Sequence, residues 1–217
     1  MGTPIGNLED ITLRSLRILK EAAQLVAEDT RQARKLLSHF TLSIPCQRYD
    51  DRMSEVRKQA LLEPCREGRA VVLVSDAGTP VISDPGWSLV DLAWREGIPV
   101  VPLPGPSAPI AALSVCGFPI SHFVFWGFLP RSPGKLRRAL ESVREWGCVV
   151  FFESPYRIIK TLEAIAALSI PELQVCVARE LTKLFEELVR GSPAEVLAHF
   201  QTGIVKGEFC VILSSRG

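Results

Sequence analysis

The segment VVLVSDAGTPVISDPGWSLVDLA, from Val71 to Ala93, indicates the fold class. It begins with a β-branched, aliphatic run, which is typical of a parallel strand buried on both faces, and it ends with apolar residues at helical spacing. The connection between them is long for a strand-to-helix loop, and it holds two Ser-Asp pairs, each followed within two residues by glycine. We therefore expect an α/β protein whose loop from Ser75 to Gly86 helps to form a ligand site, because ligands bind beyond the carboxyl ends of strands in open α/β sheets.

Strands and helices alternate along the whole chain, which is typical of α/β proteins. Beyond the opening segment, we expect strands at residues 25–27, 99–103, 123–127, 148–153, 174–179 and 208–213. The composition changes after Gly117, and the second half has four strands of its own. The sequence therefore predicts two α/β domains, residues 1–117 and 118–217, with the ligand cleft between them.

Composition restricts the class of partner. The 217 residues carry a formal net charge of only +1 and 47% of them are hydrophobic, so a sizeable core can form and any nucleic-acid site must be a local basic patch. The six cysteines are scattered without a CxxC pair or a Cys/His ligand spacing, which argues against a structural metal site. Because neither a signal peptide nor an apolar run of membrane-spanning length is visible, we expect a soluble cytoplasmic protein without a membrane partner.

Three polar loops follow expected strand ends, at Glu28–Arg31, Ser75–Gly86 and Pro104–Ala108. Ordinary turn chemistry explains any one of them, because Gly, Pro and Asp are common in turns. Three together favour a ligand site, since glycines let the backbone approach a ligand and prolines reduce the ordering entropy lost on binding. No P-loop or GxGxxG motif occurs, so the residues alone indicate a small polar ligand, with which an adenosine-containing molecule is compatible.

Several motifs, in the same order along the chain, resemble the ribosomal RNA small-subunit methyltransferase I family. They are TPIGNLEDIT (3–12), AEDTR (27–31), SDAGTPVISDPG (75–86), PGPSA (104–108), GFLP (127–130), FESPYR (152–157) and ARELTK (178–183). That family belongs to the tetrapyrrole-methylase superfold, which binds S-adenosylmethionine between two α/β domains. The resemblance implies methyl transfer from this donor to the 2′-hydroxyl of a cytidine in small-subunit ribosomal RNA, either as naked RNA or in the assembled subunit.

The resemblance also implies which residues hold the donor. The positions carried over from the family pattern in the first half of the chain are Pro4, Asp76, Gly78, Thr79, Ile82, Ser107 and Ala108. Phe152 and Ser154, at a strand end of the second domain, would form the opposite wall of the site.

Methyl transfer to a ribose hydroxyl requires in-line alignment and loss of the hydroxyl proton. The charged residues near the expected cleft are Glu28, Asp29, Arg31, Glu180 and Lys183, and the catalytic candidates among them are Glu28, Arg31 and Lys183. A lysine with a lowered pKa could accept the proton, or a cation could stabilise the forming alkoxide. Helix capping with first-turn charges and a salt-bridged surface explain the same residues without catalysis, and the proton acceptor in relatives could be water or the RNA itself.

RNA contacts are expected where basic residues gather beside an aromatic strand. A loop and a helix predicted over residues 136–146 carry Arg131, Lys135, Arg137, Arg138 and Arg144. A second group consists of Arg34, Lys35, Arg48 and Arg52. A solvated helix face explains such charges without RNA, but the neighbouring aromatic residues favour contacts to an RNA backbone.

Two other functions remain open at this stage. One is a methyltransferase of the same superfold that acts on a tetrapyrrole or a protein side chain, and the other is a non-catalytic RNA-binding protein. Relatives in the superfold form homodimers, so a homodimer is expected here. Only Met1 and Gly2 precede Thr3, so one strand of the first sheet is expected to be absent, and no helical extension follows the last strand.

Overall fold

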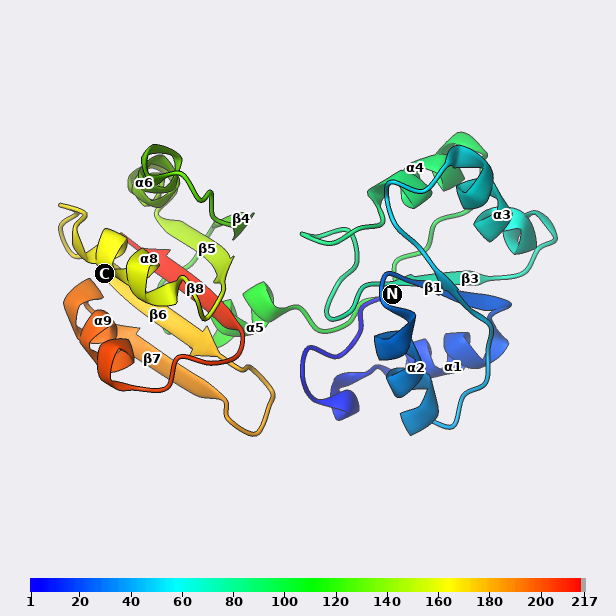
Figure 1. The fold of residues 1–217 in the computed structure, drawn as a ribbon, viewed down its shortest axis with the longest axis horizontal. Helices are drawn as coiled ribbons and strands as arrows, with labels where there is room; N and C mark the ends of the chain where they lie inside the picture. The colour runs from blue at the N-terminus through cyan, green and yellow to red at the C-terminus, as the bar shows by residue number, and fades with distance from the viewer. Residues whose placement is uncertain (216–217) are drawn as a thin grey trace. The chain divides into compact units, whose positions relative to one another are not determined.

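The chain divides into two compact units, Met1–Ser107 and Ala108–Gly217, in a computed structural model that describes residues 1–215 (Figure 1). The division falls before helix α5 (Ala108–Val115) rather than after it at Gly117. The reason is packing, because Ala112 and Cys116 are buried against the sheet of the second unit. Strands and helices alternate in both units, so the predicted α/β class is confirmed.

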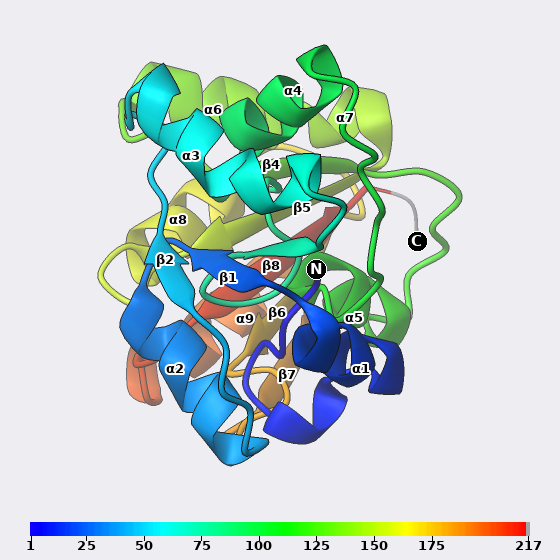
Figure 2. The same cartoon turned by 90° about the vertical axis from the view of Figure 1, so that its right-hand side faces the viewer.

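Unit 1 is built on a parallel sheet of strand order β2-β1-β3. Its strands are β1 (Gln24–Ala27), β2 (Cys46–Arg48) and β3 (Val71–Val74). Its helices are the 3-10 helix η1 (Leu8–Asp10), α1 (Leu13–Glu21), α2 (Thr30–His39), α3 (Glu55–Arg66) and α4 (Trp87–Arg95). Helices α1 and α2 cover one face of the sheet and α3 and α4 cover the other (Figure 2).

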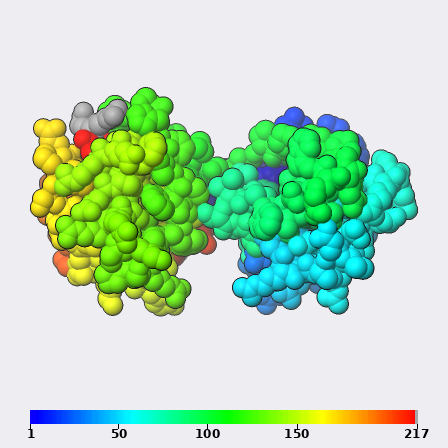
Figure 3. Space-filling model, turned by 90° about the horizontal axis from the view of Figure 1, so that it is seen from above, coloured from blue at the N-terminus to red at the C-terminus, as the bar shows by residue number. Residues whose placement is uncertain are grey.

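Successive side chains of a strand point to opposite faces, and the cores of unit 1 follow this period. Leu25 and Ala27 of β1 pack with α1 and α2. Val26 lies between these two residues in the sequence and points to the other face. There it packs with Leu62 of α3 and Leu92 of α4. Helices α3 and α4 are also neighbours on the surface, where Figure 3 shows them in cyan and green.

The expected strand at residues 99–103 is not formed. Pro99 and Pro102 lack the N–H groups that a ladder requires. The backbone N–H of Gly2 donates to the carbonyl oxygen of Leu103 at 3.0 Å, and the N-terminal ammonium donates to the carbonyl oxygen of Leu73 in β3 at 2.8 Å. The first two residues therefore link β3 to this irregular segment.

Unit 2 contains a mixed five-stranded sheet of order β4-β5-β8-β6-β7. The strands are β4 (Val124–Phe128), β5 (Cys148–Glu153), β6 (Gln174–Arg179), β7 (Glu187–Gly191) and β8 (Phe209–Ser214). Strand β7, which the sequence did not predict, pairs with β6 at the edge of the sheet. Its residues alternate between half-buried and exposed, which is typical of an edge strand rather than of a buried apolar run.

The helices of unit 2 cover the two faces of this sheet unequally. Helices α6 (Pro133–Glu141), α7 (Val143–Trp146), α8 (Ile158–Ala166) and α9 (Pro193–Thr202) pack on one face. Figure 1 shows α8 and α9 in front of the strands, and α5 packs on the other face. Ser142 separates α6 from α7, so the single helix expected over residues 136–146 is two helices. Along residues 1–215, no helix has the length and apolarity needed to cross a bilayer.

Candidate functional site

Four segments of unit 1 meet beyond the carboxyl ends of β1 and β3. The backbone N–H of Asp29, after β1, donates to a carboxylate oxygen of Asp76, after β3, at 3.2 Å. Thr3 and Gly78 exchange two backbone hydrogen bonds, of 2.9 and 3.1 Å. Gly105 lies so close to Gly2 that a Cβ atom built on it would be 2.8 Å from the Gly2 carbonyl oxygen. The three predicted loops and the N-terminal turn therefore converge.

Residues 75–86 form a loop with stored backbone strain. Gly78 adopts φ of 76°, which glycine does at little cost. Val81 and Ser83 also have positive φ, of 76° and 65°, and for a β-branched valine this conformation is a true outlier. Such strain persists only where the surroundings impose it, and it is common in ligand clamps.

Asp51 fixes the far end of this loop. Its carboxylate accepts hydrogen bonds from the backbone N–H of Gly86 at 3.1 Å and from the hydroxyl of Ser88 at 2.9 Å. The phenol of Tyr49 also donates to it. Burial opposes ionisation, but these hydrogen bonds more than offset it and hold the pKa of Asp51 below its ordinary value. No sequence motif singled out Asp51, because its role depends on contacts with residues more than 30 positions away.

Several carboxylates crowd the same edge of unit 1. Glu28 lies at the surface, yet partial desolvation raises the pKa of its carboxyl, and the charges of Asp76 and Asp84 raise it further. Burial likewise raises the pKa of the half-buried Asp84, although a hydrogen bond from Ser75 opposes this shift. This edge is therefore suited to a ligand that carries positive charge and hydroxyl groups, because ligand charge would relieve the repulsion. Asp84 is not among the site residues predicted from the sequence.

The other donor residues predicted in the first half of the chain have different degrees of exposure. Thr79 and Ile82 are exposed, with 54% of Ile82 accessible. Pro4 and Ser107 are half-buried. Ala108 begins helix α5 and so belongs to unit 2. Ile82 therefore offers an uncovered apolar side chain on the long loop.

Arg31 lies at the start of α2, and its charge is already compensated. Its guanidinium donates to both carboxylate oxygens of Asp29, with Nη2 2.7 Å from Oδ2. The side-chain hydrogen bond from Arg31 is the main cause that lowers the pKa of Asp29 to about 2. Asp29 also accepts from the backbone N–H of Arg31 as the cap of α2. The capping interpretation of this segment is thus confirmed for Asp29. Among the described residues, Glu28 is the carboxylate of this motif that has no ion-pair partner.

Phe152 and Ser154 flank a buried carboxylate at the end of β5 in unit 2. The side chain of Glu153 is fully inaccessible. Its oxygens accept from the backbone N–H of Ser154 at 2.8 Å and from the hydroxyl of Thr161 at 2.7 Å. Arg157 lies 3.6 Å from it and also donates to the carbonyl oxygens of residues 129 and 130. Much of the FESPYR motif therefore maintains the fold around the two predicted site residues.

Lys183 in unit 2 is held between two carboxylates. Its Nζ donates to Glu180 at 2.7 Å and to Glu208 at 2.8 Å. Burial lowers the pKa of Lys183, but these two hydrogen bonds more than offset that effect and the pKa lies above its ordinary value. A lysine of this kind stays protonated, so the expectation that Lys183 could accept a proton is wrong, and only its use as a cation stays a prediction.

The basic residues predicted to contact RNA lie on or next to α6 and are all exposed. Arg137 forms an ion pair with Glu141 at 2.9 Å. Arg138 donates to the backbone carbonyl of Gly134. Among the described residues, Arg131 and Lys135 have no ion-pair partner. This surface adjoins the aromatic edge strand β4, whose Phe128 is exposed.

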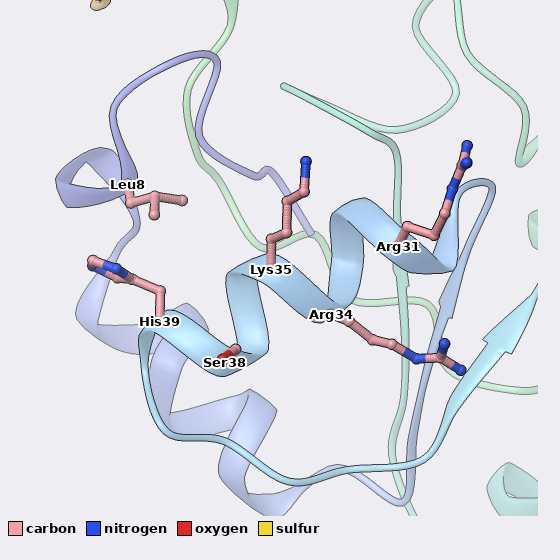
Figure 4. A pocket seen from close by; sticks show the side chains of 6 residues that line it. All are labelled: Leu8, Arg31, Arg34, Lys35, Ser38 and His39. Carbon is pink, nitrogen blue, oxygen red and sulfur yellow. The ribbon is translucent and has the colours of Figure 1, made fainter.

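A shallow open depression of about 620 Å³ lies along α2 (Figure 4). Its lining residues are Leu8, Arg31, Arg34, Lys35, Ser38 and His39. Arg34 and Lys35 of the predicted second basic group contribute to it, whereas Arg48 and Arg52 do not. Within residues 1–215, no group of three or more His, Cys, Asp or Glu side chains is arranged to hold a metal ion.

Comparison with known proteins identifies the family. The profile of the tetrapyrrole (corrin/porphyrin) methylases matches residues 1–197. The chain is 47% identical to the ribosomal RNA small subunit methyltransferase I of Thermotoga maritima, over 100% of this chain and 97% of that protein. It is 44% identical to the protein of the same name from Halalkalibacterium halodurans, over 100% of this chain and 75% of that protein.

Solved structures share the fold at low sequence identity. Cobalt precorrin-4 methyltransferase matches with a TM-score of 0.71 and 19% identity, over 99% of this chain and 92% of that one. Diphthine synthase matches with a TM-score of 0.73 and 16% identity, over 98% of this chain and 88% of that one. The predicted fold and family are both confirmed: the chain belongs to the ribosomal RNA small subunit methyltransferase I family, within the tetrapyrrole methylases, and is a methyltransferase.

Proposed function

We propose that this methyltransferase modifies small-subunit ribosomal RNA, and that the acceptor is the 2′-hydroxyl of a cytidine. S-adenosylmethionine is the methyl donor. Support for this substrate comes from the relatives, which are named ribosomal RNA small subunit methyltransferases and match the whole of this chain. A cytoplasmic homodimer that acts on the RNA or on the small ribosomal subunit is part of the proposal.

The observation that carries the proposal is the crowding of carboxylates beside a strained loop in unit 1. S-adenosylmethionine has a positively charged sulfonium and an ammonium group, so it suits an edge where Glu28, Asp76 and Asp84 repel one another. Asp76 would accept hydrogen bonds from donor hydroxyls, and Ile82 would cover an apolar part of the donor. Gly78 lets a ligand approach the backbone because it has no side chain, and its positive φ would strain any other residue at this position.

The remaining donor contacts in the proposal follow from position. Pro4, Thr79 and Ser107 lie on the segments that converge on Gly78 and Gly105. Ala108, at the start of α5, and Phe152 and Ser154, at the end of β5, belong to unit 2 and are included in the proposal because of the family resemblance of their motifs.

The donor supplies an electrophilic methyl carbon: as the ribose oxygen forms a bond to that carbon, the carbon–sulfur bond breaks and S-adenosylhomocysteine remains. The protein must align the ribose oxygen and accept the hydroxyl proton. Glu28 is the proton acceptor in this proposal, because its raised pKa makes it a stronger base than an ordinary carboxylate. Arg31 positions Asp29 and the start of α2, and Lys183 contributes a fixed positive charge.

RNA is held by the basic surface of α6 in this proposal. Arg131, Lys135, Arg137 and Arg138 are exposed and can reach phosphate oxygens, which position an RNA without reading its sequence. The aromatic side chains of β4 lie beside them, and exposed aromatic rings stack on unpaired bases.

A labelled-donor assay tests the proposed function. The protein is incubated with methyl-labelled S-adenosylmethionine and either small-subunit RNA or purified small subunits, and the digested nucleosides are analysed by mass spectrometry. We expect label in 2′-O-methylcytidine. Label on a base, on a protein or on an added porphyrinogen would contradict the proposal, and so would RNA binding without any methyl transfer.

A further inference from the structure

We propose that the depression along α2 is a second RNA-binding surface, which holds the phosphodiester backbone next to the target nucleotide. This inference rests on the proposed function, because it concerns the substrate of the same reaction. We call the surface the α2 groove and define it by Leu8, Arg31, Arg34, Lys35, Ser38 and His39.

The charge of the α2 groove is the first argument. Arg34 and Lys35 are exposed, and among the described residues neither has an ion-pair partner. Figure 4 shows the Lys35 and Arg34 side chains both extending away from the helix, in different directions. Both residues line the groove, and each adds an uncompensated positive charge that attracts phosphate.

The shape and the neutral lining support the same ligand. Ser38 and His39 continue the groove one turn beyond Lys35, and both side chains can donate hydrogen bonds to phosphate oxygens. Leu8 lies opposite His39 in Figure 4 and gives the groove an apolar side. A surface lined by cations, hydroxyl, imidazole and one aliphatic group suits a sugar–phosphate backbone better than it suits an apolar peptide.

The position of the α2 groove relative to the donor loops is the third argument, and it lies within a single unit. Helix α2 begins at Thr30, directly after Asp29, whose N–H is bonded to Asp76 of the long loop. The groove thus starts at the candidate donor site and follows a helix of 10 residues, a length of about 15 Å. RNA whose target ribose lies at the donor loops would bring its neighbouring phosphates over this helix.

The test compares two double variants that remove the same charge. Arg34→Gln with Lys35→Gln changes the groove, whereas Arg57→Gln with Lys160→Gln removes two exposed cations from α3 and α8. Helix α3 covers the opposite face of the sheet from α2. For each protein, the dissociation constant for a fluorescent small-subunit RNA fragment is measured at several salt concentrations, together with S-adenosylmethionine binding by calorimetry and the KM for RNA.

The groove variant is expected to bind RNA about 10-fold more weakly. The slope of its log affinity against log salt concentration should decrease by an amount equivalent to about one to two phosphate contacts. Donor binding should stay within about twofold of the wild type, and the matched control should keep both RNA affinity and salt dependence. Equal RNA binding by the groove variant and the control would overturn the proposal.

Two further outcomes separate the alternatives. If the wild type binds the donor but transfers no methyl group to RNA, the proposed function fails and the groove proposal fails with it. If the wild type methylates RNA while the groove variant behaves like the control, only the groove proposal is overturned. Calorimetric titration with inorganic phosphate completes the test: saturable phosphate binding that the groove variant loses, without any loss of RNA affinity, would assign the groove to a small anion instead.

Discussion

The carboxyl ends of the strands differ in the two units. In unit 1, burial raises the pKa of Glu28, and the charges of Asp76 and Asp84 at the same edge raise it further. In unit 2, the buried Glu153 has three partners. The difference shows where the molecule retains unfavourable interactions. Repulsion and backbone strain without a structural benefit are typical of functional sites, and satisfied charges are typical of structure.

Other charges of unit 2 follow the same rule. Arg179 donates to Glu187 at 2.7 Å, and Glu187 also contacts His199 at 2.7 Å. Lys183 is shared by Glu180 and Glu208. A motif in unit 2 therefore cannot be assigned to catalysis from its charges alone, and substitutions in the two units should have opposite effects on stability and activity.

The largest expected effect is that of Glu28→Gln. Methyl transfer should fall by about 100-fold or more, which is typical of removing a general base. The unfolding temperature should stay the same or rise, because the neutral amide removes the repulsion from Asp76 and Asp84. The labelled-donor assay and thermal unfolding measure the two effects. If Glu28→Gln lost stability and kept full activity, Glu28 would be a structural residue and the contrast between the two units would be wrong.

The pH dependence of stability and of activity tests the same role of Glu28. The folded-state pKa of Glu28 is raised above its ordinary value of 4.5, so its contribution to stability is complete below that value and is lost as the pH rises through the folded pKa. Activity should rise over the same interval, because the carboxylate is the base. Glu28→Gln should lack both the loss of stability and this rising limb of the rate profile. If the rate of Glu28→Gln still rose with pH as in the wild type, another titrating group would cause the rise.

Glu153→Ala tests unit 2. The substitution removes the partner of Arg157 and leaves the Thr161 hydroxyl without its acceptor, so the free energy of unfolding should fall by about 3 kcal/mol. Chemical denaturation measures this loss, and Glu163→Ala, at an exposed position on α8, is the control and should change it by less than about 0.5 kcal/mol. Equal effects of the two substitutions would mean that the buried network contributes little.

Asp51→Ala should have an intermediate effect that links stability to donor binding. It leaves the N–H of Gly86 and the hydroxyls of Tyr49 and Ser88 without their acceptor, at a cost of about 2 kcal/mol. Donor affinity should also fall, because the strained loop loses its anchor. Calorimetry and denaturation are the measurements. A variant that loses stability but binds the donor as the wild type does would show that the anchor is unrelated to the site.

The smallest effect on stability is expected for Arg137→Gln. Arg137 is 75% exposed and its ion pair with Glu141 lies at the surface, so the free energy of unfolding should change by less than about 0.5 kcal/mol. RNA affinity should fall if α6 contacts phosphates. Denaturation and RNA titration measure the two quantities, and a large loss of stability would mean that this helix face is structural.

Much of the fold could be predicted because buried strands and capped helices have local signals. The β-branched run at Val71–Val74 and the Ser192 capping box of α9 both appear as expected. Strand β7 was missed because its alternating residues depend on pairing with β6. The strand expected at residues 99–103 was wrong because its prolines prevent a regular ladder.

The candidate site could be predicted in part. Motifs identified the converging loops, since glycines and aspartates in them are close in sequence. Asp51 was missed because it meets Gly86 and Ser88 only in the folded chain. The protonation of Lys183 could not be predicted either, because it depends on Glu208, which lies on another segment.

The most direct test of the contrast is calorimetric titration of the wild type and of Asp76→Ala with S-adenosylmethionine. Asp76 is exposed, and the substitution removes one surface hydrogen bond, from the Asp29 N–H, so the variant should fold with only a small change in unfolding temperature. We predict saturable binding by the wild type and at least about 10-fold weaker binding by the variant, equivalent to about 1.4 kcal/mol. Equal donor affinity of the two folded proteins would contradict the assignment of the carboxylate edge of unit 1 as the donor site.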